Sequence, residues 1–75
     1  MTKTMRTMVD NYKALTDEHK RDFERGCYTN IDEYMKVLKD EYETISDTVY
    51  GLLRYDVIAK EVADEILNEC AYHTF

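Results

Sequence analysis

The chain has 75 residues, enough for one domain, and a domain of this size buries only about 60% of the surface that its unfolded chain exposes. Hydrophobic residues make up 44% of the chain and charged residues 35%, which indicates a compact fold and excludes an intrinsically disordered segment. The net charge is −6, and residues 26–75 carry eleven acidic but only four basic side chains, so this part of the chain repels nucleic acid and anionic lipid and attracts basic partners.

Helices are the only regular structure that the sequence supports. Proline is absent and glycine occurs only at Gly26 and Gly51, and no stretch alternates polar and apolar residues over the length of a strand. No apolar run approaches the roughly 18 residues needed to cross a bilayer, and no apolar stretch of a signal peptide follows Met1. We therefore predict a single all-α domain over residues 1–75, located in the cytoplasm and without membrane contact.

The N-terminal part predicts two short helices. Apolar residues at positions 5, 8, 9 and 12 form one face of a helix over residues 4–14. Thr16 has the residue type of a helix cap, Phe23 is the main apolar anchor of the helix that would follow, and Gly26 is a natural stop.

A long helix over about residues 31–54 is the strongest prediction. Asn30 and Glu33 have the spacing of a capping box. Apolar residues then recur at alternating intervals of four and three, as in a heptad repeat. We call this set the heptad row: Ile31, Met35, Leu38, Tyr42, Ile45, Val49 and Leu52.

A last helix is predicted over residues 57–72. Gly51, Arg54 and Tyr55 mark the end of the long helix, and Asp56 can cap the next one. The apolar stripe of this helix is wide, which suits contact with more than one neighbour. The expected architecture is a small helical bundle, with a long antiparallel hairpin (about 31–54 and 57–72) crossed by two short N-terminal helices.

Catalytic and metal-binding chemistry have little support. The candidate zinc ligands are His19, Cys27, Cys70 and His73, but His19 and Cys27 lie eight positions apart, too far for the close ligand pairs of structural zinc sites. Cys27 has no glycine-rich loop or nucleophile elbow around it that would suit a catalytic thiol. We predict no enzyme activity, no cofactor and no metal, with both thiols reduced.

Carboxylates and tyrosines are the candidate binding residues. Like charges recur one helical turn apart on both helices of the predicted hairpin, which destabilises a helix slightly and suggests a use, although a merely solvated face explains them too. Tyrosines outside the heptad row offer contact area to a partner protein, or pack beneath short helices. The candidate set is Glu61, Asp64, Glu65, Glu69, Asp40, Glu43, Asp47, Tyr34, Tyr50 and Tyr55.

Short length, helix content, acidity and abundant tyrosine without proline resemble the small accessory proteins that bacteriophages make to bind and inhibit host enzymes, including some nucleic-acid mimics. The resemblance implies a protein-binding inhibitor that occupies a basic site on a nucleic-acid-handling or defence enzyme, without binding nucleic acid itself. The alternative is a homo-oligomeric assembly module, such as a homodimer, whose copies pair through the heptad row.

Overall fold

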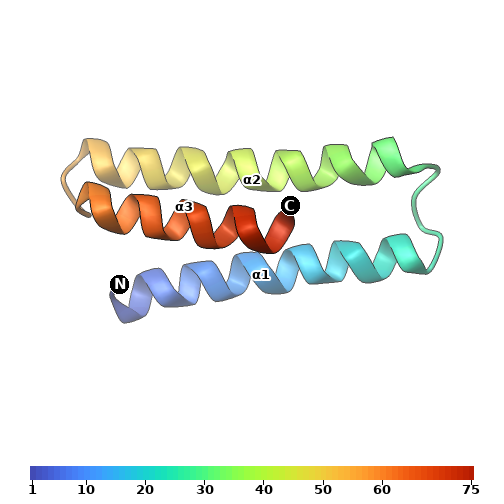
Figure 1. Cartoon of the computed structure of the whole chain (residues 1–75), viewed down its shortest axis with the longest axis horizontal. Helices are drawn as coiled ribbons and strands as arrows, with labels where there is room; N and C mark the ends of the chain where they lie inside the picture. Colours follow the sequence, from blue (N-terminus) through green and yellow to red (C-terminus); the bar gives the residue numbers. More distant parts are fainter.

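The computed structural model describes all 75 residues and contains three helices: α1 (Lys3–Glu24), α2 (Ile31–Arg54) and α3 (Lys60–Thr74). Each helix runs antiparallel to the one before it, so α1 and α3 point the same way (Figure 1). The bundle measures 41 × 20 × 15 Å. None of the three helices combines the length and the apolar character that crossing a membrane requires. The prediction of a small all-α bundle is confirmed.

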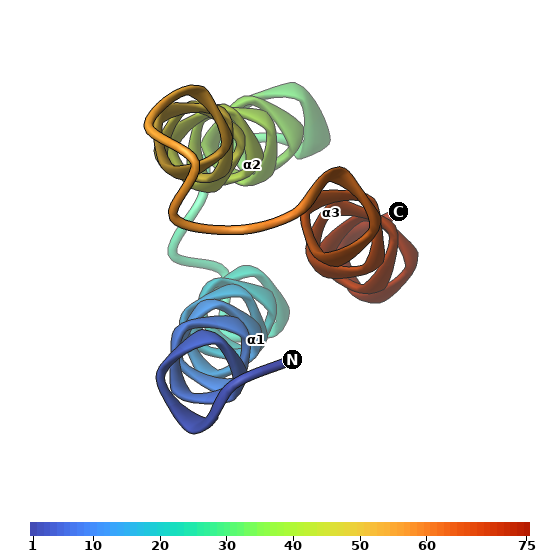
Figure 2. The same cartoon turned by 90° about the vertical axis from the view of Figure 1, so that its left-hand side faces the viewer.

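The core lies along the axis that the three helices share. Viewed end-on, the helices occupy the corners of a triangle (Figure 2). Val9 of α1, Val49 of α2 and Ile66 of α3 have no exposed surface, and burying an aliphatic side chain of this size contributes about 1.5 to 3 kcal/mol. The full cluster comprises Met5, Val9, Tyr12, Ile45, Val49, Ala63, Ile66, Leu67 and Cys70.

The N-terminal part is one helix, so the prediction of two short helices was wrong. Thr16, expected to cap a second helix, lies buried in the middle of α1. Its hydroxyl donates to the carbonyl oxygens of Tyr12 and Lys13, at 3.2 and 3.0 Å. Ser and Thr hydroxyls satisfy themselves in this way within helices, and no glycine or proline interrupts the chain before Gly26.

The connection between α1 and α2 follows its sequence signals. Gly26 adopts a left-handed conformation with φ of 80°, and the amides of Gly26 and Cys27 donate to the carbonyls of Phe23 and Asp22, the Schellman pattern that ends many helices. Asn30 accepts from the Glu33 amide at 2.9 Å, so the predicted cap of α2 is confirmed. The Glu33 carboxylate completes the turn by accepting from the backbone amide of residue 29.

The connection between α2 and α3 differs from the prediction. Asp56 does not cap α3 but follows the end of α2 in a left-handed conformation, with φ of 58°. The amides of Asp56 and Val57 donate to the carbonyls of Leu53 and Leu52, which is a second Schellman motif with aspartate in the position that usually holds glycine. Consequently α3 begins at residue 60 instead of 57, and its N-cap residue Ala59 makes no side-chain cap.

Gly51 lies within α2, which continues to Arg54. The predicted end of the long helix was therefore right at Arg54 and Tyr55, and wrong at Gly51.

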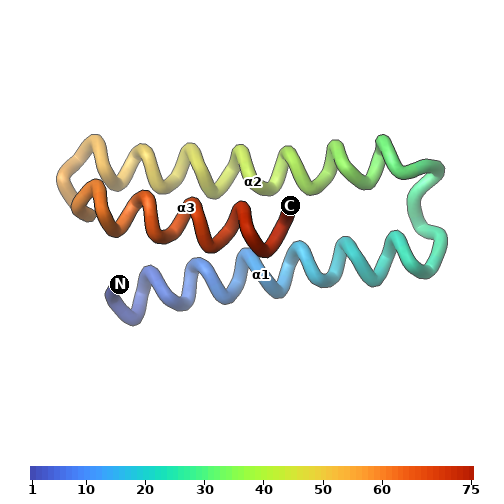
Figure 3. Tube along the Cα trace, viewed as in Figure 1, coloured from blue at the N-terminus to red at the C-terminus, as the bar shows by residue number.

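The third helix is the short one. It has 15 residues, against 24 in α2, so it is about 13 Å shorter and ends beside the middle of the other two (Figure 3). Its end is attached to α1, because the Tyr12 hydroxyl bonds to Thr74 Oγ1 at 2.5 Å and Thr74 donates in turn to the Cys70 carbonyl. Beyond Thr74, α1 and α2 pack on each other without a third helix.

The heptad row of α2 is divided by this length difference. Leu38, Ile45 and Val49 are buried, and the half-buried Tyr42 and Leu52 pack against the core. The first two members of the row, Ile31 and Met35, remain exposed because α3 does not reach them.

Replacing Asp56 by glycine should stabilise the bundle. A left-handed conformation is unfavourable for most residues with a Cβ and neutral for glycine, so we expect Asp56→Gly to raise the free energy of unfolding by about 0.5 to 1 kcal/mol in urea titrations. Asp56→Val should lower the free energy of unfolding, because a β-branched residue tolerates positive φ poorly. Equal stability of the two variants would contradict this account of the turn.

Candidate protein-binding surface

Charge is distributed unequally among the three helices. The count is five basic and five acidic side chains in α1, three and six in α2, and one and four in α3. The acidic character of the chain therefore resides on the α2–α3 hairpin, and α1 is neutral overall.

The outer face of α2 carries a regular row of acidic side chains. Asp40, Glu43, Asp47 and Tyr50 follow one another at intervals of three, four and three residues, so they share one face of the helix. All four are exposed and lie opposite buried residues such as Ile45. None of the three carboxylates forms an ion pair. We call these four residues the α2 row.

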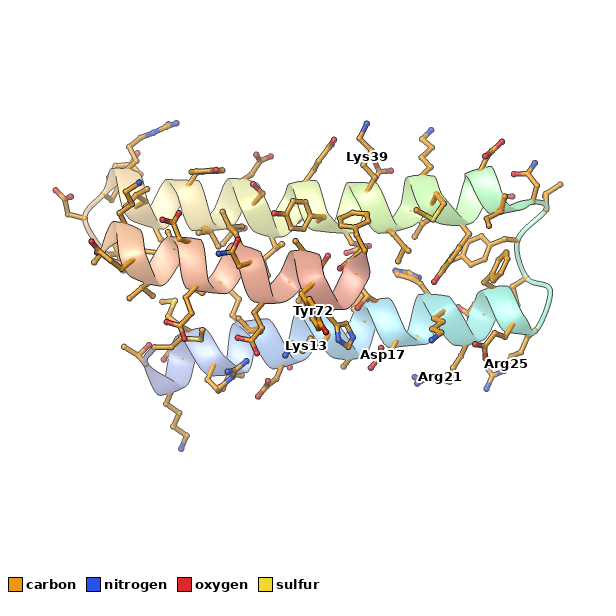
Figure 4. The ribbon with its side chains drawn as sticks, in the orientation of Figure 1. Lys13, Asp17, Arg21, Arg25, Lys39 and Tyr72 are labelled. Carbon is orange, nitrogen blue, oxygen red and sulfur yellow. The ribbon has the colours of Figure 1, made fainter.

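A second row lies on the outer face of α3. Glu61, Glu65, Asn68 and Tyr72 follow at intervals of four, three and four residues and are all exposed, and neither glutamate has an ion-pair partner. Tyr72 is 89% exposed, and Figure 4 shows it projecting from α3. It was not among the predicted site residues, although its spacing from Glu61 and Glu65 would have identified it. We call these four residues the α3 row.

Two predicted acidic residues are engaged within the chain. Asp64 lies 3.9 Å from Lys60 on the same helix, a loose and exposed contact. Glu69 accepts hydrogen bonds from Arg6 at 2.5 Å and Lys13 at 2.6 Å, both on α1. These two cations, Arg6 foremost, lower the pKa of Glu69 to about 2. Glu69 therefore holds α3 on α1 and is not a free charge.

The three predicted tyrosines lie in different surroundings. Tyr50, 53% exposed, belongs to the α2 row, and Tyr55, 79% exposed, lies in the turn after α2. Tyr34 instead stacks on Phe23 with ring centroids 4.5 Å apart, and its ring also meets that of Tyr28 at 5.6 Å. Tyr34 thus joins α1 to α2 at the end of the bundle that α3 does not reach.

The two rows point in different directions. Each lies opposite the core on its own helix, and α2 and α3 occupy two corners of the triangle (Figure 2). A flat partner surface therefore meets one row at a time, whereas a groove that receives the hairpin meets both.

The histidines are occupied by separate neighbours. His73 Nε2 lies 2.8 Å from Asp17 Oδ1 and connects α3 to α1. His19 Nδ1 lies 3.2 Å from the Tyr28 hydroxyl, and its Nε2 lies 3.4 Å from Glu41 Oε1 on α2. Both histidines thus link helices to each other.

The two cysteines differ in solvent exposure and in position. Cys27 is exposed in the loop after α1, whereas Cys70 is buried in α3, and both are free thiols. Burial raises the pKa of Cys70 to about 11. The structure contains no group of three or more His, Cys, Asp or Glu side chains arranged to hold a metal ion.

Comparison of the chain with protein-family models, with curated protein sequences and with solved structures finds no match.

The Glu69 contacts should produce a pH-dependent contribution to stability. Because the native pKa lies near 2 and the ordinary value is 4.5, the contribution is complete above pH 4.5 and is lost as the pH falls toward 2. We expect Glu69→Gln to reduce the free energy of unfolding in urea at pH 7, with a difference from wild type that shrinks below pH 4.5. Glu65→Gln, one turn away and unpaired, should show no such difference. A Glu69→Gln difference that is constant with pH would contradict the assignment.

The two thiols should differ in reactivity. A thiol reagent at pH 8 should modify Cys27 rapidly, and Cys70 only after unfolding in urea, because Cys70 is both buried and protonated. Cys27→Ser should abolish the rapid phase. Two equally rapid phases in the wild type would show that α3 separates readily from the bundle.

Proposed function

We propose that the chain is a non-catalytic protein-binding module whose α2–α3 hairpin docks on a basic surface of a partner protein. The observation that carries the proposal is the set of five exposed carboxylates without ion-pair partners in the α2 and α3 rows. These residues are Asp40, Glu43, Asp47, Glu61 and Glu65.

The arrangement of these carboxylates favours a binding role over a merely solvated face. On α3, Glu61 and Glu65 repel each other one turn apart, and pairs of this kind destabilise a helix by a few tenths of a kcal/mol. Where a carboxylate does serve the fold, as Glu69 does, it contacts cations of α1 directly. The remaining carboxylates are left available to external cations.

Exposed tyrosines supply contact area beside the charge. Each row combines carboxylates with a tyrosine, Tyr50 on α2 and Tyr72 on α3, and Tyr55 lies in the turn between the helices. Tyrosine is enriched at protein interfaces because it buries a large rigid surface and retains a hydrogen-bonding hydroxyl. Tyr34 and Glu69, which serve internal packing, are not part of the proposed surface.

The partner class that fits best is an enzyme with a basic groove that handles nucleic acid, which the chain would inhibit by occupying the groove. Asp40 and Asp47 lie about 10 Å apart along α2, so the row presents one charge roughly every 5 Å, against one phosphate per 3.4 Å of axis on a DNA strand. The row is thus a sparser line of charge than a nucleic-acid strand, and a groove that contacts both rows compensates for this.

The test is a pull-down from cell lysate with the purified chain and with a triple variant, Asp40→Lys, Glu43→Lys and Asp47→Lys. The control reverses two exposed acidic residues of α1 that have no ion-pair partner, Glu18→Lys and Glu24→Lys. We expect wild type and control to retain the same basic protein and the triple variant to lose it. Binding of the identified partner should weaken about tenfold or more between about 0.05 and 0.3 M salt, because screening shortens the range of charge interactions.

Competition with duplex DNA distinguishes occupation of a nucleic-acid groove from docking on some other basic surface. Duplex DNA should displace the chain if it occupies a nucleic-acid groove, and should have no effect if the basic surface lies elsewhere. A partner that the triple variant still retains, or one whose affinity is insensitive to salt, would contradict docking through the acidic rows.

A further inference from the structure

The end of α3 leaves a notch on the side of α2. A hollow of about 730 Å³ opens there, beside the part of the bundle where α1 and α2 extend beyond the shorter third helix (Figure 1). Met35 and Tyr42 form its apolar floor and Phe75 its end wall, where the Phe75 ring meets Tyr42 edge-on at 5.6 Å. Its rim is formed by four charged residues, Asp32, Lys36, Lys39 and Glu43.

The apolar surface at the notch is larger than the fold requires. Of the residues that line the notch, Met35 is 42% exposed and Phe75 66%. Ile31, one helical turn before Met35 and outside the notch lining, is 59% exposed. Ile31 and Met35 nevertheless belong to the same heptad row as the buried Leu38 and Ile45. Heptad positions of this kind are ordinarily covered by another helix. Ile31 and Met35 are the two members of the heptad row that no other helix of the chain covers.

The rim of the notch differs in charge from the rest of the hairpin. It has two acidic and two basic residues, whereas the chain as a whole carries −6. Asp32 and Lys39 lie seven residues apart, which places them two turns apart on the same side of α2. Lys36 and Glu43 have the same spacing on the adjacent side of the helix. A neutral rim with alternating signs permits approach of another acidic chain at a place where the acidic rows would repel it.

We propose that a second copy of the chain docks in this notch, with the two α2 helices antiparallel about a two-fold axis between positions 35 and 36. Because 32 and 39 are equidistant from that axis, Asp32 of each copy then faces Lys39 of the other. The two Met35 side chains meet near the axis, and the two Phe75 side chains are covered beside them. The contact is self-complementary, as a two-fold interface must be.

This pairing uses the flank of α2 beside the end of α3, because every residue that lines the notch belongs to α2 except Phe75. Along this flank the two α2 helices cover each other's exposed apolar side chains, as neighbouring antiparallel helices do in a bundle. The pairing does not depend on the proposed function, since the notch shares only Glu43 with the acidic rows.

Sedimentation equilibrium tests the proposal directly. We expect wild type to approach twice its mass of 9.0 kDa as its concentration rises to about 1 mM, a range that reveals even a weak dimer. Met35→Asp should remain monomeric, because Met35 lines the notch and lies next to the axis. The control is Val57→Asp, because Val57 is likewise an exposed apolar residue but lies in the turn at the opposite end of α2, and this variant should dimerise as wild type does.

Charge exchange tests the antiparallel register. Asp32→Lys and Lys39→Asp should each weaken the dimer about tenfold or more, because each replaces two facing ion pairs by two like-charge contacts. The double variant should restore the dimer. Since the Asp32→Lys change is still present in the double variant, any loss of helix stability that it causes near the N-terminus of α2 persists there and is measured separately by thermal unfolding.

Three results would overturn the proposal. A wild type that remains monomeric up to about 1 mM would show that a second copy does not occupy the notch. A dimer that is lost in Val57→Asp and kept in Met35→Asp would place the interface at the other end of α2. A double charge variant no stronger than the single variants would exclude the antiparallel register.

Discussion

The difference in length between α3 and its two neighbours governs the rest of the structure. Where α3 is present, aliphatic side chains from three helices close around Val49 and Ile66. Where it is absent, α1 and α2 are joined by rings instead, through Phe23 stacked on Tyr34. The molecule therefore has a three-helix body and a two-helix extension. The body supplies most of the hydrophobic stabilisation, and the extension exposes apolar side chains that the body would have buried.

Electrostatic contacts position the short helix. The two cations that meet Glu69 and the carboxylate that meets His73 all come from α1. Two of the five basic residues of α1 thus contact α3, and none contacts the α2 row. This division explains how a chain with ten basic residues still presents an unneutralised acidic hairpin. Arg21 near the end of α1 and Arg25 just beyond it point away from the hairpin (Figure 4).

The local sequence predicted a helix well where its residues have only one common structural use. The bounds of α2 follow from the cap at Asn30 and from the heptad row, and both are set by residues close in sequence. Thr16 and Asp56 were misassigned because each residue type has two uses. A threonine caps a helix or bonds to the carbonyls of the preceding turn, and an aspartate caps a helix or adopts the left-handed position after one. For Thr16 the use depends on burial between the helices. For the exposed Asp56 it depends on where α2 ends and α3 begins. Both are properties of the folded chain and not of the local sequence.

The residues of the candidate surface also fall into two groups, those whose exposure follows from the local sequence and those whose contacts depend on distant residues. The exposure of Asp40, Glu43, Asp47 and Tyr50 follows from the heptad row, since these residues lie on the opposite face of the same helix. The engagement of Glu69 does not, because Arg6 lies 63 positions away in the chain. A carboxylate is thus available to a partner only where α1 does not reach it. The rim of the notch, with two acidic and two basic residues, lies next to the α2 row and has Glu43 in common with it, so the balance of charge changes along α2 within about two helical turns.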